Sequence, residues 1–208
     1  MIHDFTSSTL ATLLVTLDPP GLAPIFVSLT LGMVESERRQ VALRACLIAF
    51  AIMTFFALGG GAMLNLLGIG LPAFRIAGGL LLFWIAFEMV FQSRGQRKAE
   101  TAQNAVTMDR IRDLAAFPLA IPLLAGPGAI TAAILLAGRA NSDPGLLAIL
   151  VALIGAVLFC CALVFLMAER VSRLLGTTGN VVLTRLLGVI LAALAVQFVI
   201  DGAIAALT

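Results

Sequence analysis

The residues of this chain that could do chemistry in an apolar setting lie in two short stretches, Asp18-Pro19-Pro20-Gly21 and Gly126-Pro127-Gly128. Each stretch interrupts a long apolar run. Proline has no N–H and clashes with the carbonyl four residues before it, so each stretch should free backbone carbonyls and helix-terminal N–H groups. Such groups can hold a polar solute without any covalent reaction, and the Asp18 carboxylate places a titratable group beside them.

Either stretch alone is equally well explained as a proline kink, which membrane helices tolerate where neighbouring groups satisfy the freed backbone. Two stretches in corresponding positions favour a solute site at which two unwound segments meet. The residues expected to bind the solute are Asp18, Pro19, Pro20, Gly21, Ala23, Pro24, Gly126, Pro127, Gly128 and Thr131.

Three further charges, Arg75, Glu88 and Arg185, fall inside apolar segments. A charge inside a membrane span is costly and is a functional suspect by default, so each is a candidate for a gate or for a structural contact. Arg75 and Glu88 are separated by about 20 Å along a helix axis and cannot pair directly. Glu88 lies near the end of its segment, where it could instead reach water.

Other kinds of chemistry find little support. Cys46, Cys160 and Cys161 lack the C-x-x-C spacing of a zinc site and are expected to be small packing residues. His3 is the one histidine and lies near the terminus. Because the sequence has no nucleophile–base set, phosphate loop or paired carboxylates, we expect no enzyme and no metal site. No cofactor is expected, although a coupling ion, H+ or Na+, is possible.

The composition indicates a membrane protein. Of 208 residues, 61% are hydrophobic and 12% are charged, against about 45–50% apolar residues in ordinary soluble domains. A spanning helix needs about 20 mostly apolar residues. We therefore expect an all-α membrane protein in a lipid bilayer, with six transmembrane helices and no nucleic-acid partner. The qualifying segments are 8–32, 41–60, 70–92, 114–138, 145–168 and 181–205.

Basic residues near the span ends predict the orientation, since Lys and Arg favour the cytoplasmic side. With the N-terminus outside, the outer connections hold only Arg139. The inner connections then hold Arg38, Arg39, Arg44, Arg94, Arg97, Lys98, Arg110, Arg112, Arg170 and Arg173. This bias predicts that both termini lie outside and that residues 93–113 form a cytoplasmic linker.

Local signals predict the element boundaries. The hydroxyl residues 6–8 should cap the first helix, and Asp18 should cap its second half with Pro19 in the first helical position. Residues 35–40 should form a polar turn, and the glycines at 59–61 should end the second helix. Residues 176–180 should form the turn before the last helix.

The two halves of the chain resemble each other. Pro20-Gly21 recurs as Pro127-Gly128, 107 residues later, and Arg75-Ile76-Ala77-Gly78 is matched by Arg185-Leu186-Leu187-Gly188, 110 residues later. Because each half has three spans, an odd number, the halves must be inverted relative to one another. The sequence predicts two inverted three-helix repeats, 1–92 and 114–208, with helices 1 and 4 discontinuous. Arg75 and Arg185 should be related by the pseudo-two-fold axis.

The electrostatics of broken helices indicate the solute. The N-terminal end of a half-helix favours a carboxylate and the C-terminal end favours an ammonium group. Two breaks offer both poles, which suits an α-amino acid zwitterion. The residues around the breaks are small, so we expect a small neutral substrate.

At these stretches the sequence resembles the MarC family of bacterial and archaeal membrane proteins. The matching residues are 18–26, 117–128, and Arg185-Leu186-Leu187-Gly188 running on to Gln197 and Asp201-Gly202. The resemblance covers nearly the whole chain. It implies a six-span bacterial inner-membrane protein related to transporters of glycine and alanine. Many family members carry Asn at the position of Asp18, so the resemblance leaves proton or cation coupling open.

The function expected from the sequence is therefore secondary transport of small neutral amino acids, driven by an ion gradient. Export of another small solute, including a drug, is one alternative. A non-transporting membrane scaffold or regulator is the other, although a scaffold needs no site at mid-membrane. The direction of transport and the oligomeric state stay open.

Overall fold

The computed structural model describes residues 2–91, 99, 114–140 and 143–207. All regular secondary structure within these residues is helical. The elements are α1 (Ile2–Leu17), α2 (Pro19–Leu29), α3 (Glu35–Leu66), α4 (Leu71–Val90), the π-type helix η1 (Ala115–Leu124), α7 (Pro127–Arg139), α8 (Pro144–Leu166) and α9 (Ala168–Leu207). The predicted linker 93–113 falls, apart from Ala99, outside the described residues.

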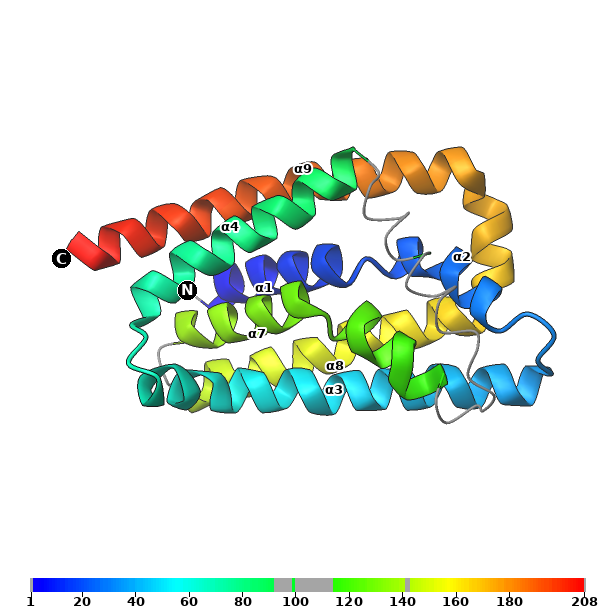
Figure 1. The fold of residues 1–208 in the computed structure, drawn as a ribbon, viewed down its shortest axis with the longest axis horizontal. Helices are drawn as coiled ribbons and strands as arrows, with labels where there is room; N and C mark the ends of the chain where they lie inside the picture. Colours follow the sequence, from blue (N-terminus) through cyan, green and yellow to red (C-terminus); the bar gives the residue numbers. More distant parts are fainter. Residues whose placement is uncertain (1, 92–98, 100–113, 141–142, 208) are drawn as a thin grey trace.

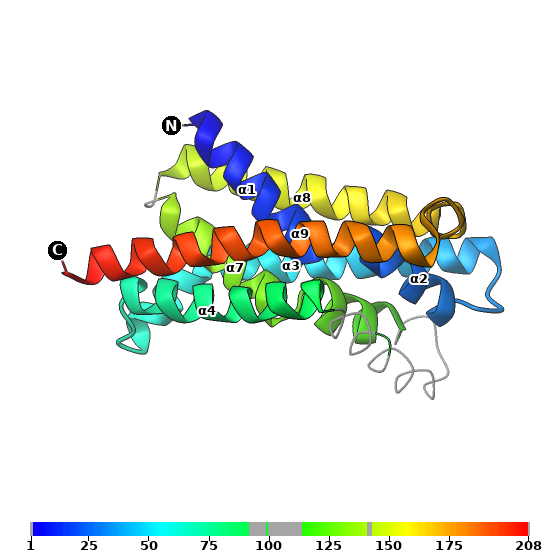
Figure 2. The same ribbon diagram turned by 90° about the horizontal axis from the view of Figure 1, so that it is seen from above.

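The helices form an elongated bundle whose members run along its long axis (Figures 1 and 2). Both chain ends lie at one end of the bundle, together with the α3–α4 connection, and the α2–α3 connection lies at the other end (Figure 1). By length and apolar composition, five helices within the described residues could span a membrane, counting α1 and α2 as one span. The pair η1 and α7, bent by 57°, brings the number to six. The prediction of an all-α, multi-pass architecture is therefore confirmed.

The longest helix–helix contact runs between α4 and α9, which lie side by side in both views. Two glycines make this close approach possible. A Cβ placed on Gly79 of α4 would lie 2.7 Å from Val199 Cγ2 and 2.8 Å from the Ala195 oxygen. Small residues allow helix backbones to approach in membranes, where apolar side chains gain nothing by leaving lipid.

The same contact is made in the reverse direction. A Cβ placed on Gly188 of α9 would lie 3.1 Å from both Val90 Cγ2 and the Ala86 oxygen of α4. Each helix therefore presents a glycine to an alanine and a valine of the other helix, four residues apart in each case. This reciprocal pattern is what a two-fold relation between α4 and α9 would produce.

Three predicted boundaries are wrong. Residues 6–8 do not cap α1, because their hydroxyls lie inside the helix and bond to carbonyls three or four residues earlier, as Thr6 Oγ1 does to Ile2 O at 2.8 Å. Residues 35–40 begin α3 instead of forming a turn, and Glu37 Oε2 accepts from the Val34 N–H at 3.3 Å. The predicted turn 176–180 contracts to one residue, Gly176, whose φ of 57° breaks the helix.

The glycines at 59–61 also remain helical, although they were expected to end the second helix. A helix interior in lipid keeps every backbone group paired, and that requirement outweighs the weak helix propensity of glycine. Gly60 has a packing role as well, since a Cβ there would lie 2.7 Å from Ile134 Cγ1 on α7. Gly59 and Gly61 have no atom within 4 Å of the corresponding position.

These environments make Gly79 and Gly59 a matched pair for a stability test. We expect Gly79→Ala to destabilise the protein by about 1–3 kcal/mol, because the added methyl group overpacks the α4–α9 contact. Gly59→Ala should stay within about 1 kcal/mol of the wild type, because the site is open and alanine favours the helix. Thermal unfolding in detergent measures both. Equal behaviour of the two variants would contradict the α4–α9 packing described above.

Candidate functional site

The first break in helical geometry is a single residue, Asp18. It adopts the left-handed conformation, with φ 54° and ψ 62°, between the end of α1 and the start of α2. Its carboxylate accepts a hydrogen bond from the Gly21 N–H at 3.2 Å, and Pro19 takes the first position of α2. The predicted cap is therefore present. Pro19 and Pro20 have no N–H to offer the α1 carbonyls four residues before them.

Gly21 is required by this cap. A Cβ on Gly21 would lie 2.1 Å from Asp18 Oδ2, so any side chain there would displace the capping carboxylate. Asp18 itself is 3% exposed. A buried carboxylate inside a span is costly unless it is held by hydrogen bonds, as this one is by the start of α2.

A line of threonines on α1 leads to Asp18 and was missed by the sequence analysis. Thr9, Thr12 and Thr16 are 2% exposed or less. Thr12 Oγ1 bonds to Ser8 O at 2.8 Å, and Thr16 Oγ1 bonds to Thr12 O at 2.6 Å. Their spacing of three and four residues, which places them on one helix face with Asp18 following, was the available signal. It was hidden because threonine is common in apolar helices.

The second break precedes α7. Within η1, Phe117 and Ile121 have extended backbone conformations, and each is followed by a proline. Gly126 is extended as well, with φ −80° and ψ 173°, and Pro127 takes the first position of α7. A Cβ on Gly126 would lie 2.4 Å from the Pro122 oxygen, so only glycine fits.

The two breaks meet inside the bundle. α2 and α7 both start near its middle and run toward opposite ends (Figure 1). The Cβ position of Gly128, in the first turn of α7, lies 3.8 Å from Thr16 Cγ2, in the last turn of α1. Thr131 is buried against α4, where its Cγ2 lies 2.7 Å from the Cβ position of Gly78.

The meeting point is filled by protein atoms. The Cδ1 of Ile85, on α4, lies 2.2 Å from the Cβ position of Gly128 and so occupies the space above that glycine. Neither of the two cavities described below is lined by a residue of the expected site. The small residues at the breaks are therefore closely packed in this conformation.

Some predicted residues lie elsewhere. Pro24 and Pro127 were expected in the site, but both are exposed on the surface, so only their effect on the backbone reaches the interior. Arg185 is also exposed. Glu88 does not reach water as considered above, because it is 6% exposed and accepts from Trp84 Nε1 at 3.2 Å.

Arg75 belongs to a polar cluster at the end of the bundle that holds the chain termini. Its Nη2 donates to the Gly138 oxygen at 3.3 Å, at the end of α7. The next residue, Arg139, forms an ion pair with Asp201 of α9 at 2.7 Å, and Gln197 Nε2 donates to the same carboxylate at 2.7 Å. These bonds tie the end of α7 to both α4 and α9. No local pattern in the sequence indicated the Arg139–Asp201 pairing, because the two residues are 62 positions apart.

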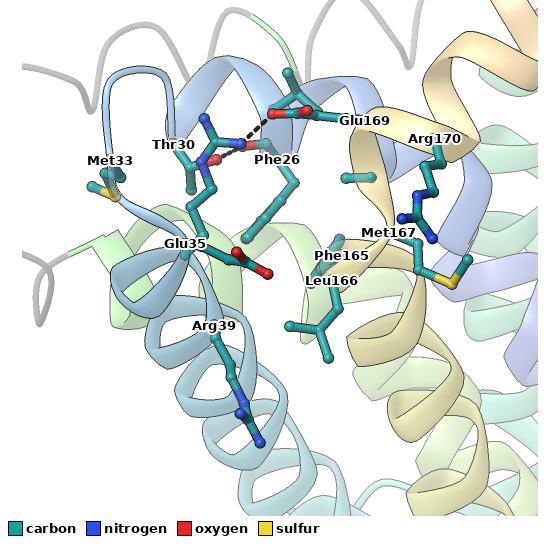
Figure 3. Close-up of a pocket in the computed structure, with 13 residues that line it drawn as sticks. Phe26, Thr30, Met33, Glu35, Arg39, Phe165, Leu166, Met167, Glu169 and Arg170 are labelled. Atoms are coloured by element: carbon teal, nitrogen blue, oxygen red, sulfur yellow. Dashed lines mark hydrogen bonds and ion pairs between the residues drawn. The ribbon is translucent and has the colours of Figure 1, made fainter.

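Two cavities lie at the two ends of the bundle. The first, here called the α2-end cavity, has a volume of about 730 Å³ and lies where α2, α3 and α8 end or begin (Figure 3). The second, called the α7-end cavity, has a volume of about 250 Å³ and lies between the ends of α3 and α7. Phe26 and Phe165, stacked with centroids 4.7 Å apart, line the inner wall of the α2-end cavity.

An ion pair crosses the rim of the α2-end cavity. Arg38, at the start of α3, donates to Glu169, at the start of α9, and Figure 3 marks this contact at Glu169. The hydrogen bond from Arg38, and the charge of the same guanidinium, lower the pKa of Glu169. No group of three or more His, Cys, Asp or Glu side chains able to hold a metal ion occurs among the described residues.

The lowered pKa of Glu169 predicts a pH-dependent stability term with a definite sign. A carboxyl whose pKa is lower in the folded state stabilises that state above its unfolded pKa of about 4.3 and loses the effect as pH falls through the folded pKa. We expect Glu169→Gln to lower the thermal midpoint slightly at neutral pH, since exposed pairs contribute little. The difference from the wild type should vanish in acid. A difference that persists below pH 3 or so would contradict this assignment.

Comparison with known proteins places the chain in a family. The family model described as MarC family integral membrane protein matches residues 3–207. A protein named "UPF0056 membrane protein" from Aquifex aeolicus is 38% identical over 192 residues, covering 91% of this chain and 88% of the relative. One of the same name from Archaeoglobus fulgidus is 36% identical over 200 residues, covering 95% and 92%.

A third relative, the UPF0056 membrane protein YhcE of Escherichia coli, is 36% identical over 185 residues, covering 89% of this chain and 85% of the relative. No solved structure matches the chain. The family match runs through both breaks and all the helices described above, and the relatives are aligned over most of their length. The chain therefore belongs to the MarC family of multi-pass integral membrane proteins.

Proposed function

We propose that this protein is a secondary transporter of small neutral amino acids, of the size of glycine or alanine, in the bacterial inner membrane. One observation carries the proposal: the start of α7, at Gly128, lies against Thr16 at the end of α1, two residues before the buried Asp18 that caps α2. Backbone that leaves the helical ladder at membrane depth is tolerated where it is buried in protein or lines a cavity, and such breaks mark solute sites in transporters.

The charges at this meeting point suit a zwitterion. The N-terminal end of α7 carries partial positive charge and would receive a carboxylate, whereas that of α2 is already capped by Asp18. The C-terminal end of α1, where Pro19 and Pro20 leave carbonyls without helical partners, carries partial negative charge and would receive an ammonium group. The flanking residues Gly21, Ala23 and Gly128 leave room only for a small substrate side chain.

Inverted repeats, 1–92 and 114–208, are part of the proposal. The reciprocal contacts of α4 with α9 support them, since Gly79 corresponds to Gly188, Ala86 to Ala195 and Val90 to Val199 at one constant offset of 109 residues. This register differs by one residue from the match of Arg75 with Arg185. The opposite directions of α2 and α7 support the same symmetry (Figure 1).

The proposed orientation places both termini outside the cell. The end of the bundle that holds the termini also holds Arg139, whereas the opposite end holds Arg38, Arg39, Arg170 and Arg173. An excess of basic residues favours the cytoplasmic side.

A flux assay with paired variants tests the site. Purified protein in proteoliposomes should show saturable glycine or alanine uptake, and Gly128→Leu should abolish it. Because Ile85 occupies the space above Gly128, the double variant Gly128→Leu with Ile85→Ala relieves the packing clash. If Gly128 lines the solute site, the double variant stays inactive while its thermal midpoint recovers.

Uptake restored by Ile85→Ala would mean that Gly128 matters for packing alone. Absence of any saturable amino-acid flux in the wild type would reject the transporter and favour the scaffold. Saturable flux of another small solute, with no effect of amino acids, would favour the exporter.

Gradient coupling is proposed to involve Asp18. Asp18→Asn removes the charge but keeps an oxygen that can accept from the Gly21 N–H, and asparagine tolerates the left-handed conformation at this position. We expect this variant to lose gradient-driven accumulation of glycine and to retain counterflow exchange. Asp18→Ala, which also loses the cap, should lose stability as well, by about 1 kcal/mol or more. Unchanged accumulation in Asp18→Asn would mean that Asp18 acts only as a helix cap.

A further inference from the structure

The two cavities at opposite ends of the bundle are lined by corresponding residues of the two halves. Val27 and Thr30 line the α2-end cavity, and Ile134 and Ala137 line the α7-end cavity. Each pair is separated by 107 residues, the same offset that relates Pro20-Gly21 to Pro127-Gly128. The cavities are therefore flanked by equivalent turns of the two helices that start at the breaks.

The opposite walls correspond in the same way. Phe165 and Ala168, at the end of α8 and the start of α9, line the α2-end cavity. Leu58 and Gly61, near the end of α3, line the α7-end cavity, again 107 residues earlier. Each cavity is thus built from the first helix of one half and the second helix of the other. Four lining residues of each cavity therefore pair at one constant offset of 107 residues.

We infer that the α2-end and α7-end cavities are the two entrances of one solute path, for a small zwitterionic amino acid, that leads to the helix breaks from opposite sides of the membrane. This inference rests on the proposed transport function and adds the route that a solute takes to the site. The helices α2 and α7 form one wall each, from the breaks to the two entrances. The entrances differ in volume, about 730 Å³ against about 250 Å³, so the α2-end entrance is the wider one in this conformation.

Polar contacts fix the end of α7 beside the narrower entrance. The end of α7 is tied to α4 by Arg75 through the Gly138 oxygen and to α9 by the Arg139–Asp201 pair. Gly138 itself lines the α7-end cavity. Opening of this entrance requires α7 to move away from α4 and α9. The Arg75–Gly138 hydrogen bond and the Arg139–Asp201 ion pair must then break. At the wide entrance, the Arg38–Glu169 pair crosses the rim between described residues that line the cavity.

Cysteine accessibility tests the inference. Val27→Cys and Ala137→Cys place one thiol at a partly exposed position in each entrance, in a background in which Cys46, Cys160 and Cys161 are replaced by alanine. A membrane-impermeant maleimide, applied to either side of oriented proteoliposomes, should label each thiol from one side only, and from opposite sides for the two positions. Ala49→Cys, in the buried core, is the unlabelled control.

The closing contacts predict how labelling changes. Asp201→Asn should raise the labelling rate at Ala137→Cys several-fold and lower it at Val27→Cys, because the equilibrium shifts toward the conformation open at the α7 end. The double swap Arg139→Asp with Asp201→Arg should return both rates toward their starting values. Saturating glycine should change the two rates in opposite directions.

Labelling of both thiols from the same side, or rates that Asp201→Asn and glycine leave unchanged, would overturn the two-entrance inference. Glycine flux measured in the same vesicles separates this failure from that of the proposed function. Flux without reciprocal labelling leaves a transporter that uses another route. Reciprocal labelling with a solute other than an amino acid would overturn the assigned substrate class.

Discussion

In a bilayer, a backbone N–H or carbonyl that leaves the helical ladder finds no water to replace its partner. This constraint explains where the chain is regular and where it is not. The segment with three consecutive glycines stays helical, because any opening there would expose unpaired groups to lipid. Regular geometry is interrupted inside the bundle at Asp18 and around Gly126, and both positions are buried. At these positions the side chain of Asp18 or the surrounding protein supplies the hydrogen-bond partners that a continuous helix would supply.

Small residues allow the interrupted segments to pack together. At Gly21, Gly126 and Gly128 a Cβ would lie less than 2.5 Å from another atom. A neighbouring group therefore occupies the space that a side chain would need at each glycine. The same device joins α4 to α9 through Gly79 and Gly188. Transport by such a bundle requires the closely packed breaks to part from α4, and Ile85 above Gly128 is the first side chain that would have to move. This movement would break polar contacts at one end of the bundle and form polar contacts at the other end.

Much of the fold follows from composition and proline chemistry. Apolar length predicts the spans, and the order aspartate, proline, proline, glycine predicts a capped helix start, since proline favours the first helical position. The predicted helix boundaries were wrong where local propensity competes with burial. The hydroxyl groups of residues 6–8 bond within the helix, and the glycines at 59–61 stay helical because their surroundings require it. Propensity is a weak prior in such places.

The ion pairs could not be read from the sequence at all. Arg38 meets Glu169 across 131 positions, and Arg139 meets Asp201 across 62. Only the packing of α3 on α8, and of α4 against both α7 and α9, brings these charges together. The threonine line on α1 was readable in principle, because its spacing matches a helix face. It gains meaning only when the burial of that face is known, since an exposed line of threonines would be unremarkable.

We propose that two opposite helix poles meet at one buried point and hold both ends of a zwitterion. Equilibrium binding of radiolabelled glycine to the purified protein, in competition with glycinamide, N-acetylglycine and alanine, measures whether both poles take part. We expect saturable glycine binding that alanine displaces, and no competition from an analogue in which either the carboxylate or the ammonium group is blocked. Effective competition by both blocked analogues, or no saturable binding of glycine, would rule this arrangement out.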